Sequence, residues 1–309
     1  MDASAPLTGA NIVRTGFAPC DAPDAADQLV AALGPDPFAL VILFVSPRTN
    51  LDTFFAGIKG RFGAAEVVGC TTAGELTATG YTEGEIVAVG LPASHFAART
   101  LFIEDLTRIQ AEARITDMIH NRKALAASHP TWTSEFAFLM VDGLSTREDA
   151  LAADLSMGLG PVPLFGGSAG DGEDFGQTHI LYKGAFHSNA AVVVQLRSSC
   201  PVHVFKTDNL LPTEKRMVVT GADPTTRRVY EINAEPAARE YARILGKDPE
   251  QLSTFTFAAH PVVVRIGEQT HVRAIQRVAQ NGDLQFFSAI DEGVVLTLAE
   301  PEDMVAHLD

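Results

Sequence analysis

The sequence predicts a mixed α/β protein, in which an internally duplicated sheet-and-helix N-terminal domain is followed by a smaller β-rich α+β domain. Three observations predict this class. Short, wholly apolar segments at 38–45 and 136–141 are typical of strands buried on both faces. An amphipathic helical pattern follows each of them. After about residue 210 the pattern changes to short strands separated by turns, so the 309 residues favour two domains over one.

Composition and charge exclude several classes of protein. With 46% hydrophobic and 20% charged residues, the chain resembles ordinary folded soluble proteins. A formal charge of -15 repels phosphate backbones and anionic lipid, so we expect no nucleic-acid partner. The longest apolar run, 38–45, is far shorter than the roughly 20 residues of a spanning helix, so we expect no membrane insertion. Without a recognisable secretory signal, the expected location is cytoplasmic.

The first repeat is predicted from a strand, a helix and a return strand. Apolar side chains recur at helical spacing after the strand at 38–45, and Asn50 stands where an N-cap is expected. That apolar stripe consists of Leu51, Phe54, Phe55, Ile58 and Phe62. The next strand ends in a glycine-rich turn, GCTTAGE, at 69–75. Strand patterns at 85–91 and 96–103 complete this half.

The same order of patterns recurs about 98 residues later. The strand at 136–141 matches 38–45, and GSAGDGE at 167–173 matches the turn at 69–75. Ser145 and Glu148 form a predicted capping box for the intervening helix. The strand at 190–196 matches 85–91 if about seven residues were inserted, as repeats allow in loops. We therefore predict two related halves, about 36–103 and 134–207, joined by a helical connector at 106–127.

The remaining chain reads as a second domain. Residues 227–233 predict a strand, and 237–245 predict a helix that Gly246 ends. Turn signals at 267–268 and 281–282 lie between β-rich runs. The predicted organisation is a lead segment at 1–24, a first domain at 25–212 and a second domain at 213–309.

The two glycine-rich loops are the first candidate site. Such a loop at the end of a strand lets a backbone approach a ligand and present amide donors, although a tight turn explains the glycines equally well. Neither common phosphate-binding motif fits, and the second loop is anionic. We expect Gly69, Gly74, Gly167 and Gly172 to serve backbone geometry, with at least one at positive φ or against a neighbouring backbone. The candidate ligand-loop residues are Gly69, Cys70, Thr71, Gly167, Ser168 and Asp171.

Cys70 and His260 carry the other candidate chemistry. Cys70 with an acidic partner such as Glu75 would suit a thiol-dependent enzyme, and a buried inert thiol is the alternative. His260 lies between apolar residues that read as strand, before a proline that favours extended geometry. An imidazole in that setting suits a metal or haem ligand, and a structural histidine is the alternative. The three cysteines fit neither a zinc pattern nor a disulfide framework.

Several separated motifs resemble the FIST family of bacterial signal-transduction proteins. Residues 68–75, 165–172 and 189–194 resemble its N-terminal domain, and 230–241 with 291–295 resemble the start of its C-terminal domain. The resemblance implies a FIST N-terminal-like domain at 25–212 and a FIST C-terminal-like domain at 213–309 that is incomplete. It further implies a ligand-binding sensor without catalysis, whose partner is a histidine kinase or a cyclic-dinucleotide signalling enzyme. A homo-oligomer is compatible with this reading.

The segments 260–265 and 289–296 look most like the NosP-type subgroup, which binds haem and senses nitric oxide. This resemblance implies haem b, with His260 as the axial metal ligand and Arg265 or Arg273 beside the propionates. His271 and His95 are competing ligands. The first hypothesis is therefore a cytoplasmic haem-binding nitric oxide sensor. The second is a sensor of a small polar ligand such as an amino acid, and the third is the Cys-dependent enzyme.

Overall fold

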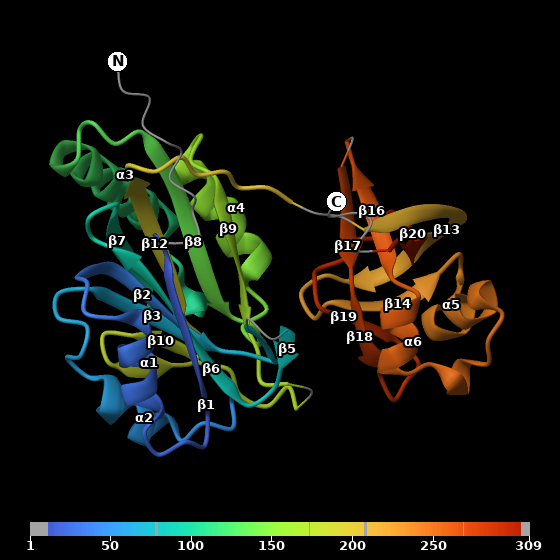
Figure 1. Cartoon of the computed structure of the whole chain (residues 1–309). Coiled ribbons are helices and arrows are strands. Elements are labelled where there is room, and N and C mark those ends of the chain that lie inside the picture. Colours follow the sequence, from blue (N-terminus) through green and yellow to red (C-terminus); the bar gives the residue numbers. More distant parts are fainter. Residues whose placement is uncertain (1–11, 78–79, 173, 207–208, 268, 304–309) are drawn as a thin grey trace. The chain divides into compact units, whose positions relative to one another are not determined.

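The chain folds into two units, Met1–Val204 and Phe205–Asp309, and the first contains two sheets in which four strands follow a common order (Figure 1). The computed structural model describes residues 12–77, 80–172, 174–206, 209–267 and 269–303. The first sheet has the order β1-β6-β2-β3-β10-β11 and the second has the order β7-β12-β8-β9. The strands of the first sheet are β1 (Arg14–Pro19), β6 (Glu85–Pro92), β2 (Phe38–Val45), β3 (Glu66–Thr71), β10 (Ile180–Tyr182) and β11 (Ala185–His187). Those of the second are β7 (Phe96–Ile103), β12 (Ala191–Ser198), β8 (Ser134–Asp142) and β9 (Leu164–Ala169).

The pairing of these strands confirms the internal duplication. In each sheet the first two neighbouring pairs are antiparallel and the third, β2 with β3 or β8 with β9, is parallel. Leu43 lies opposite Gly69 in one parallel pair, and Met140 lies opposite Gly167 in the other. The two glycines are therefore equivalent, as the offset of 98 residues predicts.

The boundary between the halves differs from the one predicted. Strand β7 pairs with β12 along its whole length, from Phe96 to Ile103, so it belongs to the second sheet and corresponds to β1. The helix that follows it is likewise the counterpart of the helix after β1 and is no mere connector. The repeats of the structure therefore run over 14–92 and 96–198 in place of 36–103 and 134–207. Periodicity identifies a strand but carries no information about which sheet the strand joins, and this explains the difference.

Helices cover the outer face of each sheet, and the inner faces pack on each other, which gives four layers (Figure 1). Helices α1 (Ala25–Leu33) and α2 (Leu51–Ile58) bury Leu29 and Phe54 against the first sheet. Helices α3 (Ala111–Ser128) and α4 (Glu148–Leu159) bury Met118 and Leu151 against the second. Each fully buried side chain of this size contributes about 1.5–3 kcal/mol relative to an exposed one.

The helix starts agree with the sequence in one half only. The Asn50 side chain accepts a hydrogen bond from the Thr53 amide at 3.0 Å, as the N-cap prediction requires. The predicted capping box at Ser145 and Glu148 is wrong, because α4 begins at Glu148 itself and the Ser145 hydroxyl donates to the Asp142 carbonyl at 2.7 Å. Ser145 lies in a turn before the helix, and its hydroxyl bonds within that turn in place of capping the helix.

The second unit is a curved sheet with two helices against it. The order is β17-β16-β20-β13-β14-β19-β18, with β15 beside β14. Helix α5 (Ala237–Leu245) ends at Gly246 in the left-handed region, as predicted, and α6 (Thr254–Ala259) precedes β16. The strands are β13 (Leu210–Asp223), β14 (Arg228–Ile232), β15 (Glu235–Pro236), β16 (Val262–Ile266), β17 (Gln269–Arg273), β18 (Ile275–Val278), β19 (Leu284–Phe286) and β20 (Val295–Pro301).

The core of the second unit surrounds Tyr241, whose side chain is fully buried.

The turns predicted at 267–268 and 281–282 lie between β16 and β17 and between β18 and β19, although residue 268 is outside the described residues. None of the helices among the described residues combines the length and apolar character needed to cross a membrane.

Candidate functional site: a polar cleft between the two glycine loops

The two glycine-rich loops meet because the halves of the first unit are interlocked. Strand β10 belongs to the second half by sequence, yet it pairs with β3 of the first, placing Ile180 opposite Cys70. The amide of Gly170 donates to the Thr71 carbonyl at 2.9 Å. A Cβ at Gly170 would lie 3.0 Å from the Ala73 amide nitrogen, so a larger residue there would push the two loops slightly apart. The loops thereby form opposite walls of one cleft.

Thr71 holds this junction together from the first half. Its amide donates to the His179 carbonyl at 3.0 Å, and its hydroxyl accepts a hydrogen bond from the His179 amide at 3.0 Å. The side chain is buried, with 1% of its surface exposed. Burial lowers the pKa of His179, and the nearby Asp142 carboxylate opposes this effect. Thr71 is therefore a structural bridge behind the cleft.

The cleft itself is polar and has a volume of about 730 Å³. It lies at the carboxyl ends of β2, β3 and β9, where parallel strands of α/β proteins commonly bind ligands. The described residues that line it are Ser46, Pro47, Arg48, Ala73, Gly74, Glu75, Tyr81, Glu83, Gly84, Asp171, Gly172 and Asp174. Carboxylates outnumber the arginine in this lining, so the cleft favours ligands that carry a cationic group.

Hydrogen bonds fix two of these carboxylates. Glu75 is 3% exposed; its Oε1 accepts from the Thr72 hydroxyl at 2.5 Å and its Oε2 from the Glu85 amide at 3.1 Å. Asp171 Oδ2 accepts from the amides of Gly176 and Gln177 at 2.6 and 2.7 Å. Both carboxylates are thus held in place before any ligand arrives, which reduces the ordering cost of binding.

Arg48 supplies the positive charge of the cleft. It lies three residues after the end of β2, and its guanidinium lies 3.3 Å from the Glu83 carboxylate. The side chains of both residues are more than half exposed. An ion pair in this setting contributes only about 0–1 kcal/mol, so a ligand carboxylate can replace Glu83 as the partner of Arg48.

Asp142 fixes both ends of the segment that contains β10 and β11, between the second glycine-rich turn and β12. Its Oδ1 accepts hydrogen bonds from the Leu144 amide at 2.9 Å and from the Thr178 hydroxyl, and its Oδ2 accepts from the Asn189 amide. The carboxylate is 4% exposed, so these donors replace the water that burial removes. Asp142 contributes rigidity to the cleft without lining it.

The glycine prediction is confirmed at two positions. Gly172 has φ of +80°, a conformation that side chains rarely adopt. At Gly69 an added Cβ would lie 2.4 Å from the backbone oxygen of Leu43, in the neighbouring strand β2. At Gly74 the same atom would meet the Tyr81 hydroxyl at 2.1 Å. Gly167 meets neither condition, since its φ is unremarkable and no atom lies within 4 Å of the added Cβ.

Of the predicted ligand-loop residues, only Asp171 lines the cleft. Gly69, Cys70 and Thr71 lie within β3, and Gly167 and Ser168 lie within β9, one or more residues before the loops begin. The Cys70 side chain is 5% exposed and packs between the two sheets. Burial raises the pKa of its thiol to about 12, so the thiolate that a nucleophile requires is scarce at neutral pH.

The predicted haem residues do not meet in one cleft. His260 follows α6, so the preceding apolar segment is helical and not the strand expected; Tyr241 donates to the His260 carbonyl at 2.6 Å. Burial lowers the pKa of the imidazole, and Lys247 and Lys215 lower it further, against Glu300. Arg265 lines a cleft that His260 does not, and it donates to the Gly267 carbonyl at 3.1 Å.

Arg273 donates to its neighbour's carbonyl, from Nη1 to the oxygen of Val272, at 3.0 Å. The competing ligands are also apart: His271 lies on β17, and the His95 ring lies 3.3 Å from the Ser199 hydroxyl. Among the described residues, no three His, Cys, Asp or Glu side chains gather as metal ligands do. Haem binding through His260 therefore stays a prediction.

Sequence reasoning missed Arg48 and Glu83, which hold opposite charges at the cleft mouth. The signal for Arg48 was present, since residues 46–48 follow a strand that was predicted to be buried on both faces and that pairs in parallel with β3. Glu83 precedes β6, and only the folded pairing of β2 with β6 brings it close to Arg48. Ser46 donates its amide to the Glu85 carbonyl at 3.1 Å, which fixes this approach.

Comparison with known protein families finds two consecutive domain matches, whose boundary lies about 30 residues after that between the two structural units. Residues 39–235 match the FIST N domain, and residues 237–309 match the FIST C domain. No curated protein matches the chain. The FIST family consists of sensory and signalling domains, and the two matches identify no catalytic domain. Because these matches cover most of its length, the chain belongs to the FIST family.

Proposed function

We propose that this FIST protein is a cytoplasmic sensor that binds an amino acid, or a closely related zwitterion, in the polar cleft between its glycine loops. A histidine kinase or a cyclic-dinucleotide signalling enzyme would receive the signal. The observation that carries the proposal is the charge pattern of the cleft: one exposed arginine faces several carboxylates at the carboxyl ends of parallel strands.

The two charged groups of an amino acid match this pattern. Its ammonium group would lie near Asp171 and Glu75, whose positions are fixed by hydrogen bonds from the protein. Its carboxylate would pair with Arg48, in the two-pronged geometry that guanidinium groups favour. A phosphate-bearing ligand fits poorly, because the carboxylates would repel it.

The place of the cleft suits a sensor. Its walls come from both halves of the first unit, with Ala73 and Gly74 from one and Asp171 and Gly172 from the other. A ligand that contacts both walls favours the arrangement in which they lie closest, and this differential affinity is what a ligand-driven switch requires. Haem binding and nitric oxide sensing remain a separate prediction on the second unit.

A ligand screen on the full chain tests the proposal. Each of the common amino acids is added, and the thermal unfolding midpoint is measured by the fluorescence of Trp132, the one tryptophan of the sequence, which lies in the first unit. A ligand at a hundred times its Kd stabilises by about 2.7 kcal/mol, or roughly 5–10 °C for a domain of this size.

Each amino acid that binds is then compared with its decarboxylated amine and its N-acetyl derivative. We expect both derivatives to bind at least about tenfold more weakly, because each lacks one of the two charges. If no amino acid shifts the midpoint, the proposed ligand class is wrong. If the amine binds as well as the amino acid, Arg48 has no role in recognition.

A further inference from the structure

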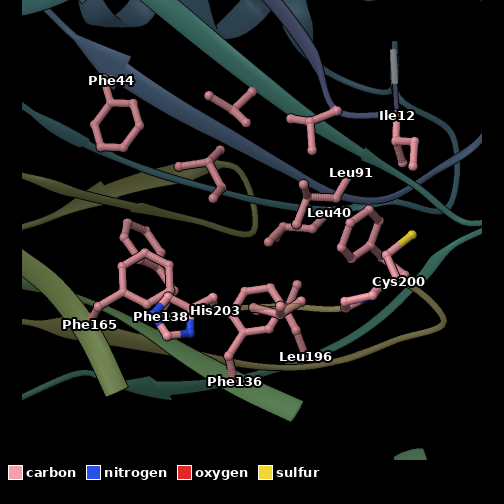
Figure 2. Close-up of a pocket in the computed structure, with 16 residues that line it drawn as sticks. Ile12, Leu40, Phe44, Leu91, Phe136, Phe138, Phe165, Leu196, Cys200 and His203 are labelled. Atoms are coloured by element: carbon pink, nitrogen blue, oxygen red, sulfur yellow. The ribbon is translucent and has the colours of Figure 1, made fainter. Parts of the chain in front are cut away.

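A second cavity, of about 500 Å³, lies between the two sheets of the first unit and shares no lining residue with the polar cleft (Figure 2). Figure 2 shows Leu40 and Leu91 of the first sheet facing Phe136 and Leu196 of the second across it. The cavity opens to solvent, since Phe165 and Val202 of its lining are 43% and 36% exposed. An apolar recess of this size that opens to solvent offers a site for an apolar guest.

The wall of the cavity is apolar and partly aromatic. The Phe165 ring lies 6.0 Å from the ring of Phe136 and 5.2 Å from that of Phe138, measured between centroids. The Phe44 ring meets Phe138 edge to face at 6.5 Å. Phe165 is 43% exposed even though its ring packs against the rings of Phe136 and Phe138. Water gains few hydrogen bonds against such a surface, and apolar cavities stay dry or take up apolar guests.

Charge is absent from the described lining. No Asp, Glu, Lys or Arg is among the residues that border the cavity, and its polar side chains are Cys200 and His203. Both lie in the segment after β12, and Figure 2 shows His203 beside Phe138 and Cys200 at the other end of the cavity, near Leu40. An ion without a partner is costly to bury in such surroundings, so the cavity selects against charged ligands.

We propose that this cavity binds a neutral, ring-containing apolar small molecule whose single polar group lies toward Cys200 or His203, the two polar side chains of the lining. The volume falls within the range of about 300–1,000 Å³ that is typical of small-molecule sites. The aromatic wall favours rings, which gain edge-to-face and offset-stacked contacts beyond simple burial. This site is independent of the amino acid proposal, since it differs in place, chemistry and lining residues.

The neutral dye N-phenyl-1-naphthylamine tests the proposal on the full chain. We expect a saturable rise in dye fluorescence with one dye per chain. Val89→Phe, which fills part of the cavity from β6, should weaken this binding at least about tenfold. Val218→Phe is the matched control, because it adds the same ring to an exposed face of the second unit and should leave dye binding unchanged.

A second measurement locates the dye without altering the cavity wall. In a Cys20→Ser background, a maleimide should label Cys200, because Cys70 is buried. Saturating dye should slow the labelling of Cys200 about tenfold, since the thiol borders the proposed site. This readout holds even if Val89→Phe fails to fold. Fluorescence that rises linearly without saturation, or Cys200 labelling that is unchanged by dye, would overturn the proposal.

Discussion

Gly69→Ala tests the claim that backbone contact fixes the first glycine position. The new methyl carbon would lie 2.4 Å from the Leu43 carbonyl oxygen and 3.0 Å from the Leu43 Cβ, on the paired strand β2. Both neighbours belong to a buried parallel pair, so the strands must separate locally. Overpacking of this kind costs about 1–3 kcal/mol. Replacing glycine also lowers the entropy of the unfolded chain, which stabilises the variant by about 0.4–1 kcal/mol and leaves a net destabilisation of roughly 0–2.6 kcal/mol.

Gly167→Ala is the matched control, because duplication places it at the equivalent position in β9. No atom lies within 4 Å of its added Cβ, so the substitution should be neutral or stabilise by up to about 1 kcal/mol. Urea unfolding followed by Trp132 fluorescence reports on the first unit for both variants. Equal destabilisation by the two substitutions would refute the argument from the Leu43 contact.

Three further predictions concern single side chains. In the native chain, iodoacetamide should modify Cys20 and Cys200 while Cys70 stays unmodified, as mass spectrometry of the digested protein would reveal; rapid labelling of Cys70 would contradict its burial. Tyr241→Phe should lower the unfolding free energy of the second unit, followed by circular dichroism, by about 1–3 kcal/mol because the His260 carbonyl loses its buried donor; an unchanged midpoint would argue against that bond. The folded state lowers the pKa of His260, so the stabilising contribution of this histidine is complete above the ordinary pKa of 6.5 and is lost as pH falls. The difference in unfolding free energy between the native chain and His260→Gln should therefore shrink between pH 7.5 and pH 5. A difference that is independent of pH would contradict this.

Sequence patterns predicted the strands and the duplication well, because both depend on local signals. The apolar segment 38–45 became β2 with its bounds unchanged, and the equivalence of Gly69 and Gly167 followed from spacing alone. Local signals failed where the outcome depended on pairing. The segment at 96–103 was correctly predicted as a strand but was assigned to the wrong half, because its partner β12 lies far along the sequence.

The candidate site was predicted in place but not in detail. The glycine loops do meet, yet the residues singled out within them mostly belong to the strands, and Cys70 faces the core. Recognition groups such as Arg48 and Glu83 come from other loops that folding brings together. His260 was misplaced because the apolar run before it fits a short helix as well as a strand, and the capping box of Ser253 with Thr256 decides for the helix.

Calorimetric titration of the best-binding amino acid into two arginine variants tests the central claim most directly. Arg48→Gln removes the cation of the cleft, and Arg61→Gln removes an exposed arginine that pairs with Asp27 at 2.8 Å outside it. We predict that Arg48→Gln weakens binding at least about tenfold while Arg61→Gln binds like the native chain. Equal affinity of Arg48→Gln and the native chain would contradict the assignment of the polar cleft as the site of this sensor.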